Sequence, residues 1–108
     1  MLSSAFTIPA KNTIAPGEDL NLLGGIVNRS EEAVTAVIRV WARLSGEWKP
    51  VLSKEEEIAA GEHKHVYYTL PFAALEAAFP EEEIEEVELY ISDSMPDAKT
   101  NGELILID

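Results

Sequence analysis

The stretch AVTAVIRVWARL at residues 33–44 decides the fold class of this chain. Every second residue in it is apolar: Val34, Ala36, Ile38, Val40, Ala42 and Leu44. The alternate positions hold Thr35, Arg39 and Arg43, with Val37 and Trp41 as the apolar exceptions. Because successive side chains of a strand leave opposite faces of the sheet, this period of two predicts a strand with one buried face. We expect the even-numbered side chains to face a core and the odd-numbered ones to face away from it.

Turn signals divide the rest of the sequence into further short strands. Glycine, proline or polar runs predict turns at residues 15–18, 28–32, 45–47 and 59–62. The strands expected around them span residues 4–8, 19–27, 48–52, 55–58, 63–70, 87–91 and 103–107. Proline donates no backbone hydrogen bond, so Pro50 places the strand at 48–52 on a sheet edge.

Alternation within these strands assigns each side chain a face. The inward set is Leu20, Leu22, Gly24, Ile26, Val66, Tyr68, Leu70, Val87, Leu89 and Ile91. The outward set includes His63, His65, Tyr67, Glu88 and Tyr90. A bulge or a close backbone approach is expected at Gly24-Gly25. One helix is predicted at residues 71–79, because its apolar residues share one side and Pro80 ends it.

Seven or eight strands, with a turn about every ten residues, predict an all-β antiparallel sandwich with one short helix. A chain of 108 residues is near the commonest size of one domain, so we expect residues 1–108 to form a single domain.

The segments PGED (16–19), IVNRSEE (26–32), AAGEH (59–63) and VYYTL (66–70) resemble bacterial immunoglobulin-like modules of the CARDB or fibronectin-III-like type. In those modules an asparagine closes one strand, and a Gly-Glu turn precedes a strand of alternating aromatic residues. The resemblance covers residues 15–70 and continues beyond them by strand count. It implies an immunoglobulin-like sandwich with a binding or spacer role and no catalytic residue. The chain departs from antibody domains in having no cysteine pair and no clear tyrosine corner.

The charge balance excludes some partners. Twenty acidic and eight basic residues give a net charge of −12, with the excess at residues 55–57 and 81–88. Such a surface repels phosphate backbones and anionic lipids, so neither nucleic acid nor a membrane is an expected partner. A solvated acidic surface explains the charge, and a basic partner or a divalent cation is the alternative.

The expected location is the cytoplasm. The chain has no cysteine, no recognisable signal peptide at residues 1–10 and no apolar run of about 20 residues. It would be extracellular if it were cut from a longer exported protein, and only then would the Asn28-Arg29-Ser30 sequon matter.

Two groups of residues are candidate metal ligands, although no cofactor is the leading expectation. His63 and His65 project from one strand face, but a third ligand would have to come from a neighbouring strand. Asp93, Asp97 and Asn101 recur through the last loop with oxygen ligands that suit calcium. Turn chemistry explains the same three residues without a metal.

No nucleophile elbow or phosphate loop is present, so we expect no enzyme. The predicted interface is an outward apolar strip with charged neighbours, made of Val37, Arg39, Trp41, Arg43, Glu88 and Tyr90. The strip would bind a second copy or another protein, unless the protein's own loops or helix cover it. The leading hypothesis is therefore a non-catalytic interaction module.

Two other hypotheses remain, and the first of them uses the last loop, residues 94–102. In the first, the chain is a small intracellular proteinase inhibitor that presents this loop as bait. In the second, the chain is a calcium-stabilised spacer domain of a surface protein.

Overall fold

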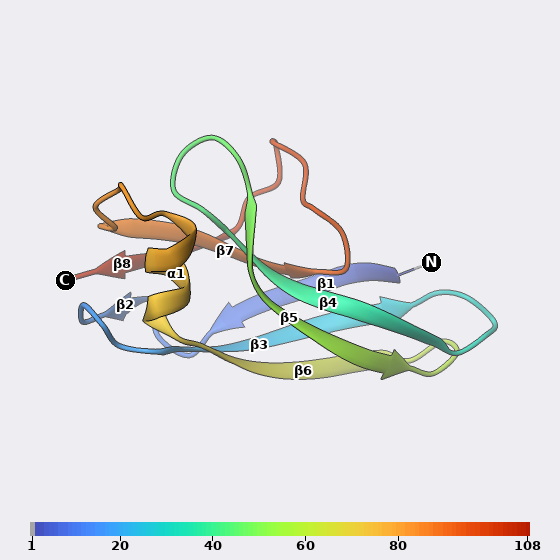
Figure 1. Ribbon diagram of the computed structural model, residues 1–108. Helices are drawn as coiled ribbons and strands as arrows, with labels where there is room; N and C mark the ends of the chain where they lie inside the picture. The colour runs from blue at the N-terminus through green and yellow to red at the C-terminus, as the bar shows by residue number, and fades with distance from the viewer. Residues whose placement is uncertain (1) are drawn as a thin grey trace.

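The computed structural model describes residues 2–108 and forms two packed β-sheets with one short helix (Figure 1). The first sheet has the order β1-β3-β6, formed by β1 (Leu2–Pro9), β3 (Leu20–Asn28) and β6 (His63–Leu70). The second has the order β2-β8-β7-β4-β5, formed by β2 (Thr13–Ile14), β8 (Glu103–Ile107), β7 (Glu86–Ser92), β4 (Val34–Arg43) and β5 (Lys49–Ile58). The predicted all-β sandwich with one short helix is confirmed.

The core lies between the two sheets and follows the predicted alternation. Ile38, Val40 and Ala42 of β4 are fully buried, and the other even-numbered residues of the stretch pack around them in part. The predicted inward apolar residues of β3, β6 and β7 complete the same cluster. Burying one large aliphatic side chain contributes about 1.5–3 kcal/mol, so this shared interior is the main force that holds the sheets together.

The turns at residues 15–18 and 59–62 are built in the same way. In each, the glutamate N–H donates to the first alanine carbonyl, at 3.1 and 3.0 Å. The alanine N–H donates back to the glutamate carboxylate, at 3.0 and 2.8 Å. Gly17 and Gly61 occupy the third position with φ of 84° and 68°, a region that favours glycine. The repeated Ala-x-Gly-Glu sequence therefore specifies its turn locally.

Two details of the strands differ from the prediction. Residues 48–52 and 55–58 were expected to form separate strands, but β5 is continuous and pairs with β4 through a bulge. Val40 pairs with Leu52 and Trp41 with Pro50, so the bulge takes up one extra residue of β5. β5 is nevertheless an edge strand, as Pro50 predicted. The strand β2 was missed because two residues carry no periodic signal, and its pairing with β8 is parallel rather than antiparallel.

The helix α1 (Phe72–Ala78) confirms the one predicted helix and lies at the end of the sandwich where β8 and β2 end (Figure 1). Phe72, Leu75 and Phe79 bury its apolar side against the core. Within residues 2–108, no helix is long and apolar enough to cross a membrane.

Asn28 is the most deeply buried of the polar residues Thr7, Asn28 and Ser92, with no solvent exposure. Its side-chain amide donates to the carbonyls of Glu32, Ile58 and Ala59, at 2.9, 3.2 and 3.1 Å. Its Oδ1 accepts from the backbone N–H and the hydroxyl of Ser30. The asparagine that closes β3 therefore joins the loop after β3 to the end of β5, and its amide nitrogen is not free to carry a glycan.

Candidate functional site

The loops 44–48 and 93–102 cover the centre of the predicted interface. Both loops rise beside each other from the second sheet (Figure 1), and the Trp48 indole N–H donates to the Asp97 carbonyl at 3.2 Å. Trp41 does lie on the outward face, opposite Tyr90. It is nevertheless only 8% exposed, and its own indole N–H donates to the Ser92 carbonyl. Trp41 is therefore buried, as the alternative of a strip covered by the chain itself predicts, and its role in an interface stays a prediction.

Arg43 holds the loop 93–102 in place. Its guanidinium donates to both Glu88 carboxylate oxygens, at 3.3 and 2.9 Å, and to the carbonyls of Ala98 and Thr100. It also lies 4.4 Å from the ring centroid of Trp48. The Arg43 hydrogen bond holds the pKa of Glu88 below its usual value, and the Gly102 N–H adds to this effect. The contacts of Arg43 and Glu88 therefore hold the loop in place.

The remaining residues of the predicted interface are less completely covered. Val37 is 38% exposed, while Arg39 and Tyr90 are half-buried. Tyr90 also packs against the Trp48 ring, with centroids 6.2 Å apart. Their role in binding a partner stays a prediction.

The structure shows local roles for several of the candidate metal ligands. The Asp97 carboxylate accepts hydrogen bonds from the Lys99 N–H and the Thr100 hydroxyl, which is the turn role. Across residues 2–108, no three histidine, cysteine or acidic side chains are arranged to hold a metal ion. His63 and His65 do share the outward face of β6 as predicted, and the His65 ring meets the edge of the Phe6 ring. Calcium binding by Asp93, Asp97 and Asn101 stays a prediction.

Exposed apolar side chains occur on both sheets. Leu104 and Leu106 of β8 are 46% and 45% exposed on the second sheet, and a further exposed apolar surface lies on the first sheet. We call it the β1–β3–β6 face and define it by Phe6, Ile8, Leu23, His65 and Tyr67. Leu23 pairs with Ile8 on one side and with Tyr67 on the other, so the three side chains form one row across the sheet. Ile8 is 51% and Tyr67 is 73% exposed, and a shallow hollow of about 400 Å³ lies along this row.

A second row of this face depends on Gly25. Gly25 pairs with Phe6 on one side and with His65 on the other. The Phe6 ring lies over the position that a Cβ on Gly25 would occupy, so a side chain there would collide with it. The sequence signals Tyr67 as outward, but it does not reveal the β1–β3 register that brings Phe6 and Ile8 beside it.

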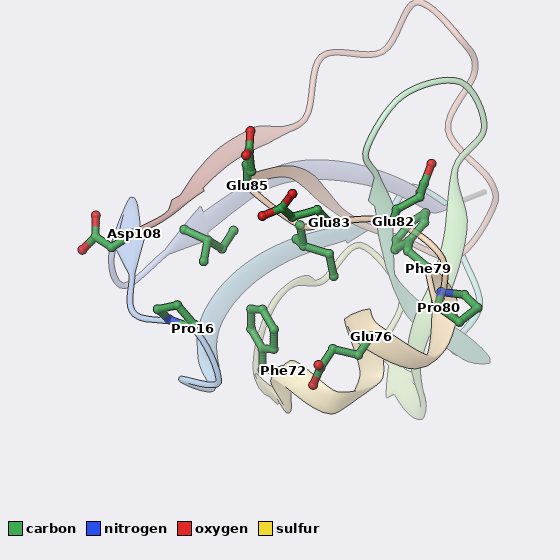
Figure 2. A pocket seen from close by; sticks show the side chains of 11 residues that line it. Pro16, Phe72, Glu76, Phe79, Pro80, Glu82, Glu83, Glu85 and Asp108 are labelled. Atoms are coloured by element: carbon green, nitrogen blue, oxygen red, sulfur yellow. The ribbon is translucent and has the colours of Figure 1, made fainter.

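A separate hollow of about 660 Å³ lies beneath α1, and we call it the α1 hollow. Its lining is both apolar and acidic, and we call the apolar lining residues its floor and the acidic ones its rim. The residues that line it are Pro16, Phe72, Glu76, Phe79, Pro80, Glu82, Glu83, Ile84, Glu85, Ile107 and Asp108. Figure 2 shows Glu83 extending across the hollow, whereas Glu82 and Glu85 point away from its centre. Sequence reasoning did not find this hollow, since its walls come from three separate parts of the chain.

Known structures share the fold. No protein-family model and no curated protein matches the chain. A β-glucosidase from Erythrobacter marinus matches 100% of the chain with a TM-score of 0.71 and 13% identity. A β-glucosidase involved in saponin metabolism from intestinal bacteria matches 100% of the chain with a TM-score of 0.70 and 14% identity. A β-glucosidase from Listeria innocua in complex with gluconolactone matches 99% of the chain with a TM-score of 0.68 and 18% identity. The chain spans only 15–16% of the length of these proteins, so the likeness concerns the fold alone.

Proposed function

We propose that the chain is a non-catalytic interaction module that pairs with a second copy of itself through the β1–β3–β6 face. The observation that carries this proposal is the exposed row of Ile8, Leu23 and Tyr67, set on three hydrogen-bonded strands. Contiguous exposed apolar side chains on a rigid support are typical of the centre of a protein interface.

The charge distribution supports self-association at this face in particular. The outward positions of β1, β3 and β6 hold Ser3, Phe6, Ile8, Asn21, Leu23, Gly25, Val27, His63, His65, Tyr67 and Thr69. None of these is acidic, lysine or arginine, in a chain whose net charge is −12. Two such chains repel each other wherever their carboxylates meet, so an uncharged face is where they approach at the least electrostatic cost.

The structural neighbours support a module rather than an isolated enzyme. In the β-glucosidase chains, a sandwich like this one makes up about a sixth of the length, so the fold occurs alongside other parts of a long chain.

Sedimentation velocity over a range of protein concentrations tests the proposal. The wild type should dimerise, and more strongly at higher salt, because salt screens the repulsion between the acidic copies. Tyr67→Lys or Ile8→Lys should give a monomer. Val37→Lys adds the same charge to an exposed apolar position on the other sheet, and it should leave the dimer intact. A monomeric wild type, or a dimer that Val37→Lys disrupts equally, would contradict the proposal.

The proteinase-inhibitor hypothesis remains a second candidate because of how the bait loop is held. Arg43 and Trp48 fix residues 93–102 from within, while the Met95 side chain stays largely exposed at the surface. A rigid loop with an exposed side chain suits an inhibitor, since little entropy is lost on binding. Incubation with a panel of endoproteinases would test it, and rapid cleavage of the loop without inhibition would exclude it.

A further inference from the structure

We infer that the α1 hollow binds an arginine-bearing peptide segment of a partner protein. This site lies on different elements from the β1–β3–β6 face, so the inference goes beyond the proposed self-association. It depends on the shape of the hollow and on the charge around it.

The floor of the hollow offers an apolar surface for a side-chain stem. Phe72 and Phe79 come from the two ends of α1, and Ile107 comes from the last strand. Ile84, from the loop between α1 and β7, completes the floor and is itself only partly buried. A volume of about 660 Å³ lies in the range of sites that hold small ligands or peptide side chains.

The rim has carboxylates without cationic partners. Glu76, Glu82, Glu83, Glu85 and Asp108 line the hollow, and no lysine or arginine does. Three ion pairs occur within residues 2–108, and none of them includes a rim carboxylate. Lys49 is the cation placed by its contacts beside α1, but it donates to the Ala78 carbonyl and lies over the Phe79 ring at 4.9 Å. Glu82 and Glu85 point away from the centre of the hollow, so the inference depends on the unpaired carboxylates of Glu76 and Glu83.

An apolar floor below an acidic rim complements one kind of group. Arginine carries an apolar stem with a planar cation, which pairs with carboxylates and stacks on aromatic rings such as Phe72. An anionic ligand would be repelled. A bare metal ion would leave the apolar floor unused, and no metal-binding group occurs in residues 2–108. The arrangement thus favours a segment in which arginine alternates with apolar residues.

The probe is a fluorescein-labelled peptide, Arg-Leu-Arg-Leu-Arg with blocked ends, and the readout is fluorescence anisotropy with the full chain. We expect the double variant Glu76→Gln/Glu83→Gln to weaken binding about tenfold, because it removes two carboxylates that line the hollow. The matched control Glu55→Gln/Glu57→Gln removes two exposed carboxylates from β5 and should change affinity less than about twofold. A peptide with glutamate in place of arginine should not bind.

Two further measurements separate this site from its alternatives. Amide chemical shifts should move for the residues around Phe72 and Ile107 when the peptide is added. The variant Tyr67→Lys should bind the peptide as tightly as the wild type, even if it no longer dimerises. Peptide binding can therefore be tested whether or not the chain forms a dimer. Equal weakening by the two double variants would mean general attraction to an acidic protein and would overturn the inference. Absence of binding at about 0.01 M salt, where screening is weak, would overturn it as well.

Discussion

Replacing Asn28 by aspartate should test how strongly one buried side chain holds the loops together. The amide donates to three backbone carbonyls, and Oδ1 accepts from Ser30. Aspartate has the same shape and keeps the Oδ1 contacts. Its ionised second oxygen cannot donate and would face the same three carbonyl oxygens without exposure to solvent.

The expected loss of stability is about 3–5 kcal/mol for Asn28→Asp. The amide has two N–H groups, and each net hydrogen bond contributes about 1 kcal/mol. Leaving buried polar groups unsatisfied adds about 1–3 kcal/mol. Typical domains are stable by about 5–15 kcal/mol, so the variant would still fold but with a much reduced margin.

Urea unfolding, followed by the fluorescence of Trp41 and Trp48, measures this loss at neutral pH. With a slope of about 1–3 kcal/mol/M, the urea midpoint should fall by about 1–5 M. The control Asn12→Asp makes the same change at an exposed position and should stay within about 0.5 kcal/mol of the wild type.

The pH dependence of Asn28→Asp supplies a second check with a defined sign. A protonated carboxyl at position 28 regains one O–H donor, so folding favours the neutral form and raises the pKa of the new group. The stability that the protonated carboxyl gives to the folded variant is fully present below the unfolded pKa of about 3.9. It is lost as the pH rises through the raised pKa of the folded state. The difference in free energy of unfolding between Asn28→Asp and the wild type should therefore be smaller at acidic pH. A neutral-pH loss below about 1 kcal/mol, or a gap that does not change with pH, would refute the reasoning.

Three other variants test separate parts of the fold. Gly25→Val should destabilise by about 1–3 kcal/mol, because the Phe6 ring must leave its position, and thermal melting would measure this. Arg43→Met should expose the loop 93–102 to limited proteolysis while the other loops stay resistant, and uniform resistance would count against the bracing role of Arg43. The pKa of Tyr68 is raised mainly by burial of its hydroxyl and secondly by its hydrogen bond to the Glu56 carboxylate. Stability should therefore fall as the pH rises above about 10, and Tyr68→Phe should show a shallower fall in alkaline urea titrations.

The local sequence was enough to predict most of the strands, their faces and the turns, but not β2 or the continuity of β5. Ile38 and Val40 of β4 face the core because side chains alternate along any extended chain, whatever the strand pairs with. Gly17 and Gly61 allow the backbone that their turns need, and the glutamate that follows each closes the turn. These features depend on neighbours within a few residues, and such neighbours can be read from a single sequence.

The tertiary structure alone decided which outward surfaces are open. Trp41 has the same outward parity as Val37, but it is only 8% exposed, and its indole N–H donates to Ser92 of a strand about 50 residues further along the chain. Pairing of β1 with β3 sets Ile8 beside Leu23, and residues of α1 and of the end of β8 line the α1 hollow together. The order and register of strands are set by contacts between distant segments, and a periodic pattern within one segment carries no information about them.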